Sequence, residues 1–342
     1  MSEKKVLLTG ISGFLGSHTA IKLLDAGYKV TGTLRAIERA SAIRAIIGRH
    51  TENIGNLELV EADLSNAAIW KELTSQKDYV QHIASPFPRT LPESESELIQ
   101  TAKSGTLNIL QAAAENNVKR VVLTSSVAAV VYGKTRHELN KIFSEDDWSN
   151  QDHTSDNTPY FRSKTVAEKA AWNFIASSGS RMELTSVLPG AILGPVLEDD
   201  FGTSANMVIK LLDGSSPALP NIGFDIVDVR SVADLLVKAM EAPHAAGERY
   251  IASAGYLTFK EIAVILKEHF PNRKVPDKQL PNLLVRLLAH FDASIKPILV
   301  DLGVKRKLDI SKARRELQWN PGSTPEAVIA CAESLIELQI VK

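Results

Sequence analysis

The sequence predicts an α/β protein whose main domain is a doubly wound parallel sheet with helices on both faces. Three observations support this prediction. Short apolar runs alternate with segments of helical periodicity through the first half of the chain. The first run, Val6–Leu8, lacks polar alternation, as expected of a strand buried on both faces. The first run is followed at once by closely spaced glycines. A smaller, discontinuous C-terminal lobe is expected to complete the fold.

The start of the chain has the order strand, glycine turn, helix, strand. Val6–Leu8 is a short apolar run, a helical pattern begins at Phe14, and Gly27 is placed to end that helix. Lys29–Leu34 is predicted as the next strand. Such a βαβ unit is typical of dinucleotide-binding Rossmann domains, because glycines let the backbone approach a pyrophosphate at the helix N-terminus.

Each glycine of the first turn has a role in this interpretation. Gly10 permits the tight turn, Gly13 lets the backbone approach the pyrophosphate, and Gly16 brings the helix close to the strand. A turn that merely needs glycine is the alternative, and the complete strand–turn–helix context disfavours it. The residues expected to contact a coenzyme here are Thr9, Gly10, Ser12, Gly13, Phe14, Leu15 and Gly16.

The composition excludes several classes of protein. The chain has 342 residues, 44% hydrophobic and 23% charged, which is ordinary for a globular protein of one or two domains. A net charge of −1 gives no case for nucleic-acid or anionic-membrane binding. The single cysteine, Cys331, excludes an intrachain disulfide and a cysteine-rich zinc site. We expect a cytoplasmic protein without metal, either monomer or homodimer.

The pattern of strand and helix signals changes along the chain and predicts a coenzyme domain and a substrate-binding lobe. Residues 1–190 are expected to form the coenzyme domain, to which residues 225–245 return, and residues 191–224 and 246–342 mainly form the substrate-binding lobe. Residues 191–220 are irregular and rich in Gly, Pro and Asp. The strands predicted for the coenzyme domain are Val6–Leu8, Lys29–Leu34, Leu57–Val60, Tyr79–Ile83, Val121–Thr124 and Leu184–Leu188.

The end of the second strand favours NADP(H) over NAD(H). An NAD-selecting fold usually places a carboxylate there to hold the ribose 2′-hydroxyl. Here the strand ends at Arg35, Arg39 follows, and the first carboxylate is Glu38. A guanidinium pairs with a 2′-phosphate, whereas a carboxylate repels it. Arg35 as an ordinary solvated cation is the alternative.

Further coenzyme contacts are expected after the third and fourth strands. Asp63 and Leu64 stand where an adenine ring would lie, although Asp63 is equally consistent with a helix N-cap. Ala84 and Ser85 are small enough to let a coenzyme pass close to the backbone. His82 lies within an apolar strand, so a hydrogen-bonded structural histidine is favoured over an imidazole base.

Two segments together indicate catalytic chemistry. The fifth strand ends in Thr124, Ser125 and Ser126, and Tyr160 and Lys164 follow later, four residues apart on one helix face. A free phenol has a pKa of about 10, and a neighbouring ammonium makes it a better proton donor or acceptor near neutral pH. A serine hydroxyl would stabilise charge on the same substrate oxygen.

These motifs resemble those of the extended short-chain dehydrogenases/reductases, and within them the branch of dihydroflavonol 4-reductase and NADPH-dependent aldehyde (carbonyl) reductases. The resemblance covers nearly the whole chain and is weakest near residues 201–225 and 271–304. The motifs that carry it are Thr9-Gly-Ile-Ser-Gly-Phe-Leu-Gly16, Arg35, His82-Ile-Ala-Ser-Pro86, Thr124-Ser-Ser126, Tyr160-Phe-Arg-Ser-Lys164 with the segment up to Trp172, Leu188-Pro-Gly-Ala-Ile-Leu-Gly-Pro195 and Lys312-Ala-Arg-Arg-Glu-Leu-Gln-Trp319.

The resemblance implies a role for each matched residue. Tyr160 would protonate the substrate oxygen, Lys164 would hold the nicotinamide ribose and lower the pKa of Tyr160, and Ser126 would be the catalytic serine. Thr124 would also contact the coenzyme. Asn108 matches a position linked to a water-mediated proton path, although a polar group satisfied within a helix is as good an interpretation.

The remaining site residues are expected on position alone. Pro189, Gly190 and Ile192 would lie along the nicotinamide, with a structural Pro-Gly turn as the alternative. An apolar pocket for a small carbonyl substrate is expected beside the catalytic residues, although most such residues are simply core. Its candidate members are Pro86, Phe87, Ser126, Val127, Tyr132 and Phe161.

The leading hypothesis is therefore an NADPH-dependent aldehyde or ketone reductase with Tyr160 as proton donor. The alternative is a nucleotide-sugar epimerase or dehydratase of the same superfamily. Such enzymes commonly carry an Asn-containing motif in place of Leu188–Pro195, and dehydratases place an acidic residue beside the Thr/Ser pair, where Val127 and Ala128 follow Ser126 here. Both departures argue against a nucleotide-sugar substrate. A 3β-hydroxysteroid dehydrogenase-like oxidation is disfavoured by Arg35. A non-catalytic NADP(H)-sensing protein would typically have lost the tyrosine or the lysine.

Overall fold

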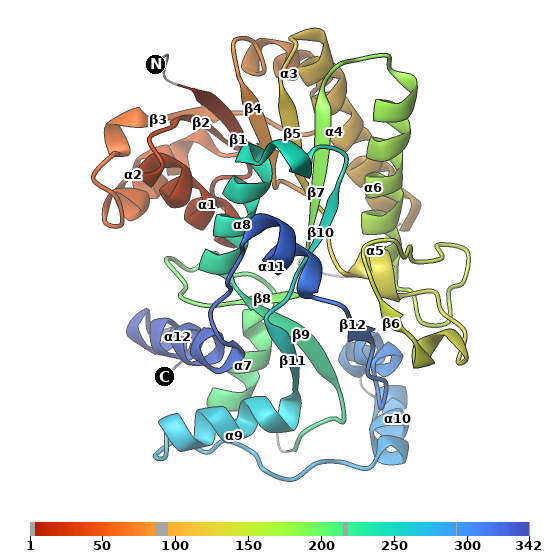
Figure 1. Ribbon diagram of the computed structural model, residues 1–342. Helices are drawn as coiled ribbons and strands as arrows, with labels where there is room; N and C mark the ends of the chain where they lie inside the picture. The colour runs from red at the N-terminus through yellow and green to blue at the C-terminus, as the bar shows by residue number, and fades with distance from the viewer. Residues whose placement is uncertain (1–3, 86–94, 215–217, 292, 342) are drawn as a thin grey trace.

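The computed structural model describes residues 4–85, 95–214, 218–291 and 293–341. Their central element is a seven-stranded sheet, parallel throughout, with the order β10-β7-β5-β4-β1-β2-β3. This arrangement confirms the predicted doubly wound fold (Figure 1). The strands are β1 (Lys5–Thr9), β2 (Lys29–Leu34), β3 (Leu57–Glu61), β4 (Tyr79–His82), β5 (Arg120–Thr124), β7 (Glu183–Pro189) and β10 (Arg249–Ala252).

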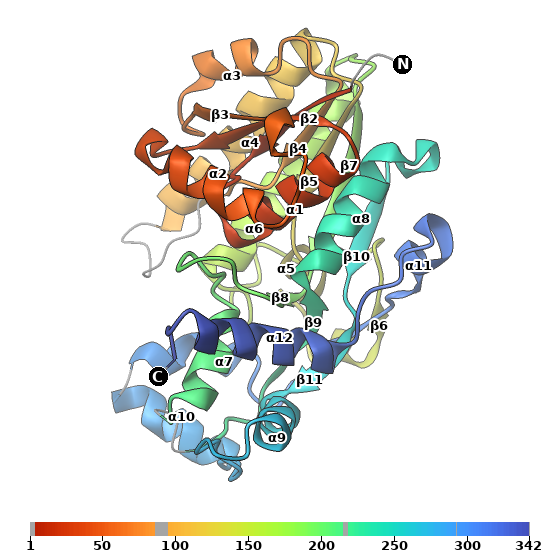
Figure 2. The same cartoon turned by 90° about the vertical axis from the view of Figure 1, so that its left-hand side faces the viewer.

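Helices cover both faces of this sheet, as Figure 2 shows. The side chains of β1 explain why: Val6 and Leu8 pack into one core and Leu7 into another, on opposite faces. None of the described helices is long and apolar enough to cross a membrane. The helices are α1 (Phe14–Asp25), α2 (Ala40–Gly48) and α8 (Val229–Glu241) on one face, and α3 (Ala67–Leu73), α4 (Glu95–Glu115) and α6 (Pro159–Ser177) on the other.

A second lobe lies below the central sheet in both views (Figures 1 and 2). It is built on a three-stranded sheet of order β11-β9-β8, in which β9 and β11 are antiparallel. Its elements are β8 (Ala191–Leu193), α7 (Ala205–Leu212), β9 (Gly223–Asp228), β11 (Gly255–Thr258), α9 (Phe259–His269), α10 (Asn282–Phe291) and α12 (Thr324–Glu337).

Shorter elements join the two parts. The two-stranded sheet pairs β6 with β12 in parallel, so the polar loop before α6 is tied to the C-terminal region. The connecting elements are α5 (Ala128–Val131), β6 (Ile142–Phe143), β12 (Lys307–Leu308) and α11 (Ser311–Leu317). Short 3-10 turns lie elsewhere along the chain: η1 (Ile37–Arg39), η2 (Ile54–Asn56), η3 (Glu138–Asn140), η4 (Pro243–Ala245) and η5 (Ala293–Val300).

The structure differs from the expected division of the chain at three places. Strand β10 (249–252), assigned above to the second lobe, pairs with β7 at the edge of the central sheet. It is only four residues long and begins with a charged arginine, so it has little of the apolar signal of a buried strand. Residues 191–220, expected to be irregular, contain β8 and α7. In the returning segment 225–245, β9 belongs to the small sheet, while α8 packs on α1.

Arg120 fastens α8 to the central sheet. It is the first residue of β5 and only 1% exposed. Its guanidinium donates to the backbone carbonyls of Ala239 (2.8 Å), Met240 (3.1 Å) and Ala242 (2.6 Å), and to the Glu183 carboxylate (2.8 Å). The last carbonyls of a helix have no partner within the helix, so this buried cation satisfies them and complements the negative end of the helix dipole.

Replacing Arg120 by methionine should therefore destabilise the whole protein. We expect Arg120→Met to lower the free energy of unfolding by about 3 kcal/mol, because it leaves buried carbonyls and the Glu183 carboxylate unpaired. Urea unfolding followed by circular dichroism measures the change. The control is Lys119→Met at the exposed neighbouring position, which should change stability by less than about 0.5 kcal/mol. Equal losses in both variants would contradict this role of Arg120.

Candidate active site

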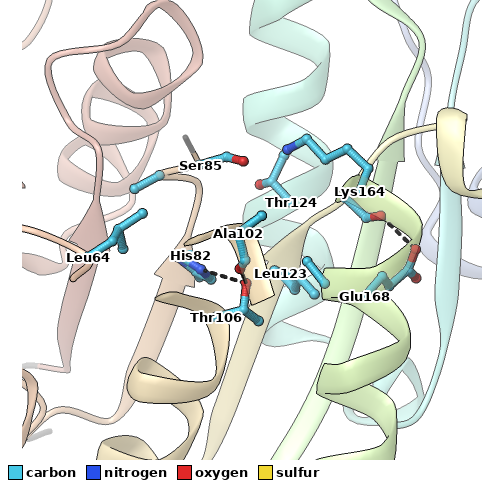
Figure 3. A pocket seen from close by; sticks show the side chains of 12 residues that line it. Leu64, His82, Ser85, Ala102, Thr106, Leu123, Thr124, Lys164 and Glu168 are labelled. Carbon is cyan, nitrogen blue, oxygen red and sulfur yellow. Dashed lines mark hydrogen bonds between the residues drawn. The ribbon is translucent and has the colours of Figure 1, made fainter. Parts of the chain in front are cut away.

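A hollow opens at the carboxyl ends of the central strands, where ligands bind in doubly wound folds (Figure 3). Residues from β4, β5, α4 and α6 meet there, although they are far apart in the sequence. Within the described part of the chain, no group of acidic, histidine and cysteine side chains is arranged to hold a metal ion. The residues that line the hollow are Leu64, His82, Ala84, Ser85, Ala102, Thr106, Leu123, Thr124, Ser125, Lys164, Ala167 and Glu168.

The glycine turn lies beside this hollow, and its three glycines meet different constraints. Gly10 has φ +75°, and a Cβ atom there would lie 3.0 Å from the backbone of Ala84. A Cβ at Gly16 would lie 2.0 Å from the carbonyl oxygen of Gly10, so helix and turn touch directly. At Gly13 the nearest atom would be 3.5 Å away. The fold therefore requires glycine at positions 10 and 16 but leaves space at position 13.

The first turn of α1 is available to an anion. Gly13 is its N-cap residue, no described side chain caps the helix, and its first turn carries no acidic residue. Ser12 lies half-buried in the turn, and Phe14 and Leu15 are buried. Free backbone N–H groups together with the positive end of the helix dipole attract phosphate groups.

His82 has a structural role, as favoured from the sequence. Backbone N–H groups of Ile83 and Ala84 donate to the Thr9 hydroxyl, so that hydroxyl donates its own proton to Nδ1 of His82 (2.9 Å). The Thr106 hydroxyl donates to a backbone carbonyl and is 3.4 Å from Nε2 of His82. The ring is held as the neutral Nε2–H tautomer. Burial, followed by the charge of Lys164, lowers the pKa of His82 to about 3, well below that of a useful base.

Helix α6 brings Tyr160 and Lys164 together. The side chain of Thr158 caps the helix by accepting from the backbone N–H of Phe161 (3.3 Å), and Pro159 occupies its first position. The Lys164 ammonium lies 5.9 Å from the centre of the Tyr160 ring. Burial raises the pKa of Tyr160 and lowers that of Lys164 to about 8, the latter opposed by the Glu168 carboxylate. The expected lowering of the Tyr160 pKa by Lys164 is thus not found, because burial dominates, and the phenol is held in its neutral, proton-bearing form.

The hollow contains polar groups that the described residues leave without partners. The Thr124 hydroxyl is buried and has no hydrogen-bond partner among them. The Lys164 side chain extends toward Thr124 in Figure 3, and we find no described side chain or carbonyl that accepts a hydrogen bond from its ammonium. Buried polar groups are normally satisfied, so unsatisfied ones in a hollow indicate a place for a ligand.

The two serines that follow Thr124 differ in their surroundings. The Ser125 hydroxyl donates to the Glu168 carboxylate at 2.6 Å, and Glu168 forms a buried ion pair with Arg249 (2.8 Å). The Ser126 hydroxyl accepts from the backbone N–H of Ala128 (3.1 Å) and has only a long contact, 3.5 Å, to the Pro189 carbonyl. The Ser126 proton is therefore less engaged and more available to a substrate oxygen.

The residues at the ends of β2 and β3 occupy exposed positions. Arg35 is exposed and close enough to Asp63 to lower its pKa, although hydrogen bonds from Ser65 contribute more to that shift. Asp63 accepts from the Ser65 hydroxyl at 2.5 Å and does not cap α3, whose N-cap residue is Asn66. Arg39 forms ion pairs described below.

Leu64 lines the hollow. It also contacts Asn108, the residue whose role the sequence left open. The amide of Asn108, on α4, donates to the backbone carbonyl of Leu64 at 3.1 Å. A Cβ at Gly105 would lie 3.1 Å from the Leu64 side chain, so α4 and this loop pack closely. The structure thus shows Asn108 as a satisfied polar group that holds the loop in place.

Of the expected nicotinamide and substrate residues, Pro189 lies beside Ser126, whose hydroxyl is 3.5 Å from its carbonyl oxygen. Pro189 ends β7, and a Cβ at Gly190 would lie 2.3 Å from the carbonyl oxygen of Asp225, so glycine is needed there for packing alone. Ile192 is half-buried in β8. Tyr132 is buried and stacks on Phe161, with 3.9 Å between ring centres.

The structure describes only some of the other pocket candidates. Val127 is half-buried directly after Ser126. The Tyr132 hydroxyl donates to Asp301 (3.2 Å), which makes Tyr132 a support for Phe161 within the core. Pro86 and Phe87 lie outside the described residues.

Sequence reasoning missed two residues that complete this site. Glu168 lies one further turn along α6, so Tyr160, Lys164 and Glu168 follow each other at intervals of four, a helical signal that was present in the sequence. Arg249, on β10, had no local signal, because it meets Glu168 only through the pairing of β10 with β7.

Comparison with known proteins identifies the family of this chain. The model of the NAD dependent epimerase/dehydratase family matches residues 6–253. An uncharacterized oxidoreductase of Schizosaccharomyces pombe is 34% identical over 80% of this chain and 84% of its own length, and dihydroflavonol 4-reductase of Hordeum vulgare is 30% identical over 86% and 80%. The crystal structure of yeast methylglyoxal/isovaleraldehyde reductase Gre2 complexed with NADPH is 26% identical, covers 99% of this chain and all of its own, and superimposes with a TM-score of 0.82. The chain therefore belongs to the NAD dependent epimerase/dehydratase family and is an oxidoreductase of the extended short-chain dehydrogenase/reductase type.

Proposed function

We propose that this protein is an NADPH-dependent reductase that converts an aldehyde or ketone into an alcohol, with Tyr160 as the proton donor. The observation that supports this most is the arrangement at the carboxyl ends of β4 and β5. There the buried Lys164 ammonium faces an unsatisfied Thr124 hydroxyl and lies 5.9 Å from the ring of Tyr160. A cation beside a neutral phenol is suited to general acid catalysis.

The residues present fit a dinucleotide. The space at Gly13 and the uncapped start of α1 suit a pyrophosphate, and the Thr124 hydroxyl and Lys164 ammonium supply polar partners for a ribose. The exposed guanidinium of Arg35 at the end of β2 favours a 2′-phosphate. The yeast Gre2 structure, which covers this chain almost completely, is an NADPH complex. When bound, NADPH supplies the hydride that reduces the carbonyl carbon.

Three side chains have distinct tasks in this proposal. Tyr160, kept protonated by burial, gives its proton to the carbonyl oxygen as negative charge develops on it. The Lys164 ammonium stabilises the phenolate that results, because a positive charge favours the charged form of a neighbouring phenol. The Ser126 hydroxyl donates a hydrogen bond to the same substrate oxygen and orients the carbonyl.

The test of this function is NADPH consumption with a panel of aldehydes, aryl ketones and β-keto esters, with NADH as the comparison. Tyr160→Phe should reduce kcat at least about 100-fold and leave the Kd for NADPH within about twofold, because it removes a proton donor without changing packing volume. The matched control is Tyr28→Phe, whose hydroxyl contacts Glu241 away from the site and whose loss should leave kcat unchanged. A Tyr160→Phe enzyme within tenfold of wild-type kcat would overturn the assigned role.

The glycine turn allows a separate test of coenzyme binding. Gly13→Ala should leave the thermal midpoint nearly unchanged, because its Cβ meets nothing closer than 3.5 Å, yet raise the Kd for NADPH about tenfold or more by filling the pyrophosphate position. Gly16→Ala should lower the thermal midpoint clearly, because its Cβ would clash with the carbonyl of Gly10. Unchanged NADPH binding by a folded Gly13→Ala protein would count against a pyrophosphate there.

The pH dependence follows from Lys164. Because burial lowers its pKa to about 8, the ammonium loses its proton as the pH rises through that value, and the positive charge beside Tyr160 is lost. We therefore expect kcat/KM for NADPH, which reports the free enzyme, to fall above about pH 8. Lys164→Arg should be slower but should not show this fall, because a guanidinium stays charged. A flat wild-type profile up to pH 10 would contradict the assignment.

A further inference from the structure

A segment of the second lobe, residues 195–204, lies against the coenzyme domain, and we call it the strap. The carbonyl oxygen of Pro195 is 2.9 Å from Nε2 of His18 on α1. At the other end, a Cβ built at Gly202 would lie 3.0 Å from the ring of Phe14, at the start of α1. The segment between β8 and α7 lies below α1 in both ribbon views (Figures 1 and 2). The strap thus runs beside the turn that is proposed to bind the pyrophosphate.

Two carboxylates of the strap neutralise Arg39. The Nη2 atom of Arg39 is 2.6 Å from the Glu198 carboxylate, and its Nη1 atom is 3.7 Å from that of Asp200. The side chain of Arg39 is 39% exposed, that of Glu198 19% and that of Asp200 31%, so solvent screens the two ion pairs only in part. Arg39 ends η1, the turn that follows β2, and is therefore on the side of the domain where Arg35 stands.

In the proposed function, the 2′-phosphate of the coenzyme and the two carboxylates of the strap compete for the same guanidinium. A 2′-phosphate held at the end of β2 would come near a guanidinium that already pairs with two carboxylates. The phosphate would be attracted by Arg39 and repelled by Glu198 and Asp200. NADH has a 2′-hydroxyl in place of the phosphate, so it would leave these ion pairs intact.

We propose that Glu198 and Asp200 are specificity-determining residues, which compete with the coenzyme 2′-phosphate for Arg39 and thereby limit the preference for NADPH over NADH. The inference rests on the proposed function, because it assumes that the dinucleotide site is the one described above. Binding of NADPH transfers Arg39 from the strap to the phosphate, whereas binding of NADH does not. Neither carboxylate touches the reacting atoms, so their effect is on coenzyme affinity and not on the chemical step.

The test removes the two charges while keeping the size of the side chains. Glu198→Gln combined with Asp200→Asn should lower the Kd for NADPH about three- to tenfold and change the Kd for NADH less than twofold, as measured by coenzyme fluorescence titration. In displacement titrations, the double variant should bind adenosine 2′,5′-bisphosphate more tightly than the wild type does, and 5′-AMP with nearly unchanged affinity. This difference would assign the effect to the 2′-phosphate. Adding Arg39→Met to the double variant should abolish the gain.

The matched control is Asp199→Asn, the exposed carboxylate between the two, which has no described ion pair and should leave both dissociation constants within about twofold. Weaker NADPH binding in the double variant would show that the carboxylates orient Arg39 for the phosphate, and would overturn the competition. Equal changes for NADPH and NADH, or no change in a folded double variant, would overturn it as well. Failure of the wild-type protein to bind either coenzyme would instead reject the proposed function together with this inference.

Discussion

The buried ion pair between Glu168 and Arg249 holds the candidate active site together. Glu168 lies on α6, the helix that carries Tyr160 and Lys164, and Arg249 lies on β10 at the edge of the central sheet. The Ser125 hydroxyl, at the end of β5, donates to the same carboxylate. One buried carboxylate therefore fixes helix, sheet edge and strand end relative to each other. Buried charges of this kind need complete pairing, which the guanidinium, the hydroxyl and the Trp172 indole N–H (3.3 Å) supply.

The same ion pair determines the electrostatics of the site. The Glu168 oxygens accept hydrogen bonds from Arg249, Ser125 and Trp172, and among the described contacts none comes from the Lys164 ammonium one turn away. Glu168 still acts on Lys164 through its charge and opposes the loss of the lysine proton that burial causes. The result is a buried cation that is partly stabilised and whose hydrogen-bonding capacity is left for a ligand.

The second lobe adds to this site through backbone proximity. Strand β8 begins directly after the Pro189-Gly190 pair, and Gly190 is pressed against Asp225 of β9. The lobe is thus anchored one residue from the Pro189 carbonyl that the Ser126 hydroxyl approaches. The strap then returns to α1 and Arg39. The lobe therefore contacts the coenzyme domain at two places in the proposed site, near Gly190 and at Arg39.

The doubly wound fold and the first six central strands could be predicted from the sequence alone, because apolar runs, glycines and helical periodicity are local signals. The sequence also placed Tyr160 and Lys164 on one helix face, since a spacing of four is a local property, and it favoured the structural role of His82. The sequence did not predict that β10 joins the central sheet, that Arg249 pairs with Glu168, or that Glu198 pairs with Arg39; the folded chain shows these contacts. These contacts join residues that are about 60 to 160 positions apart, and no local pattern marks such partners.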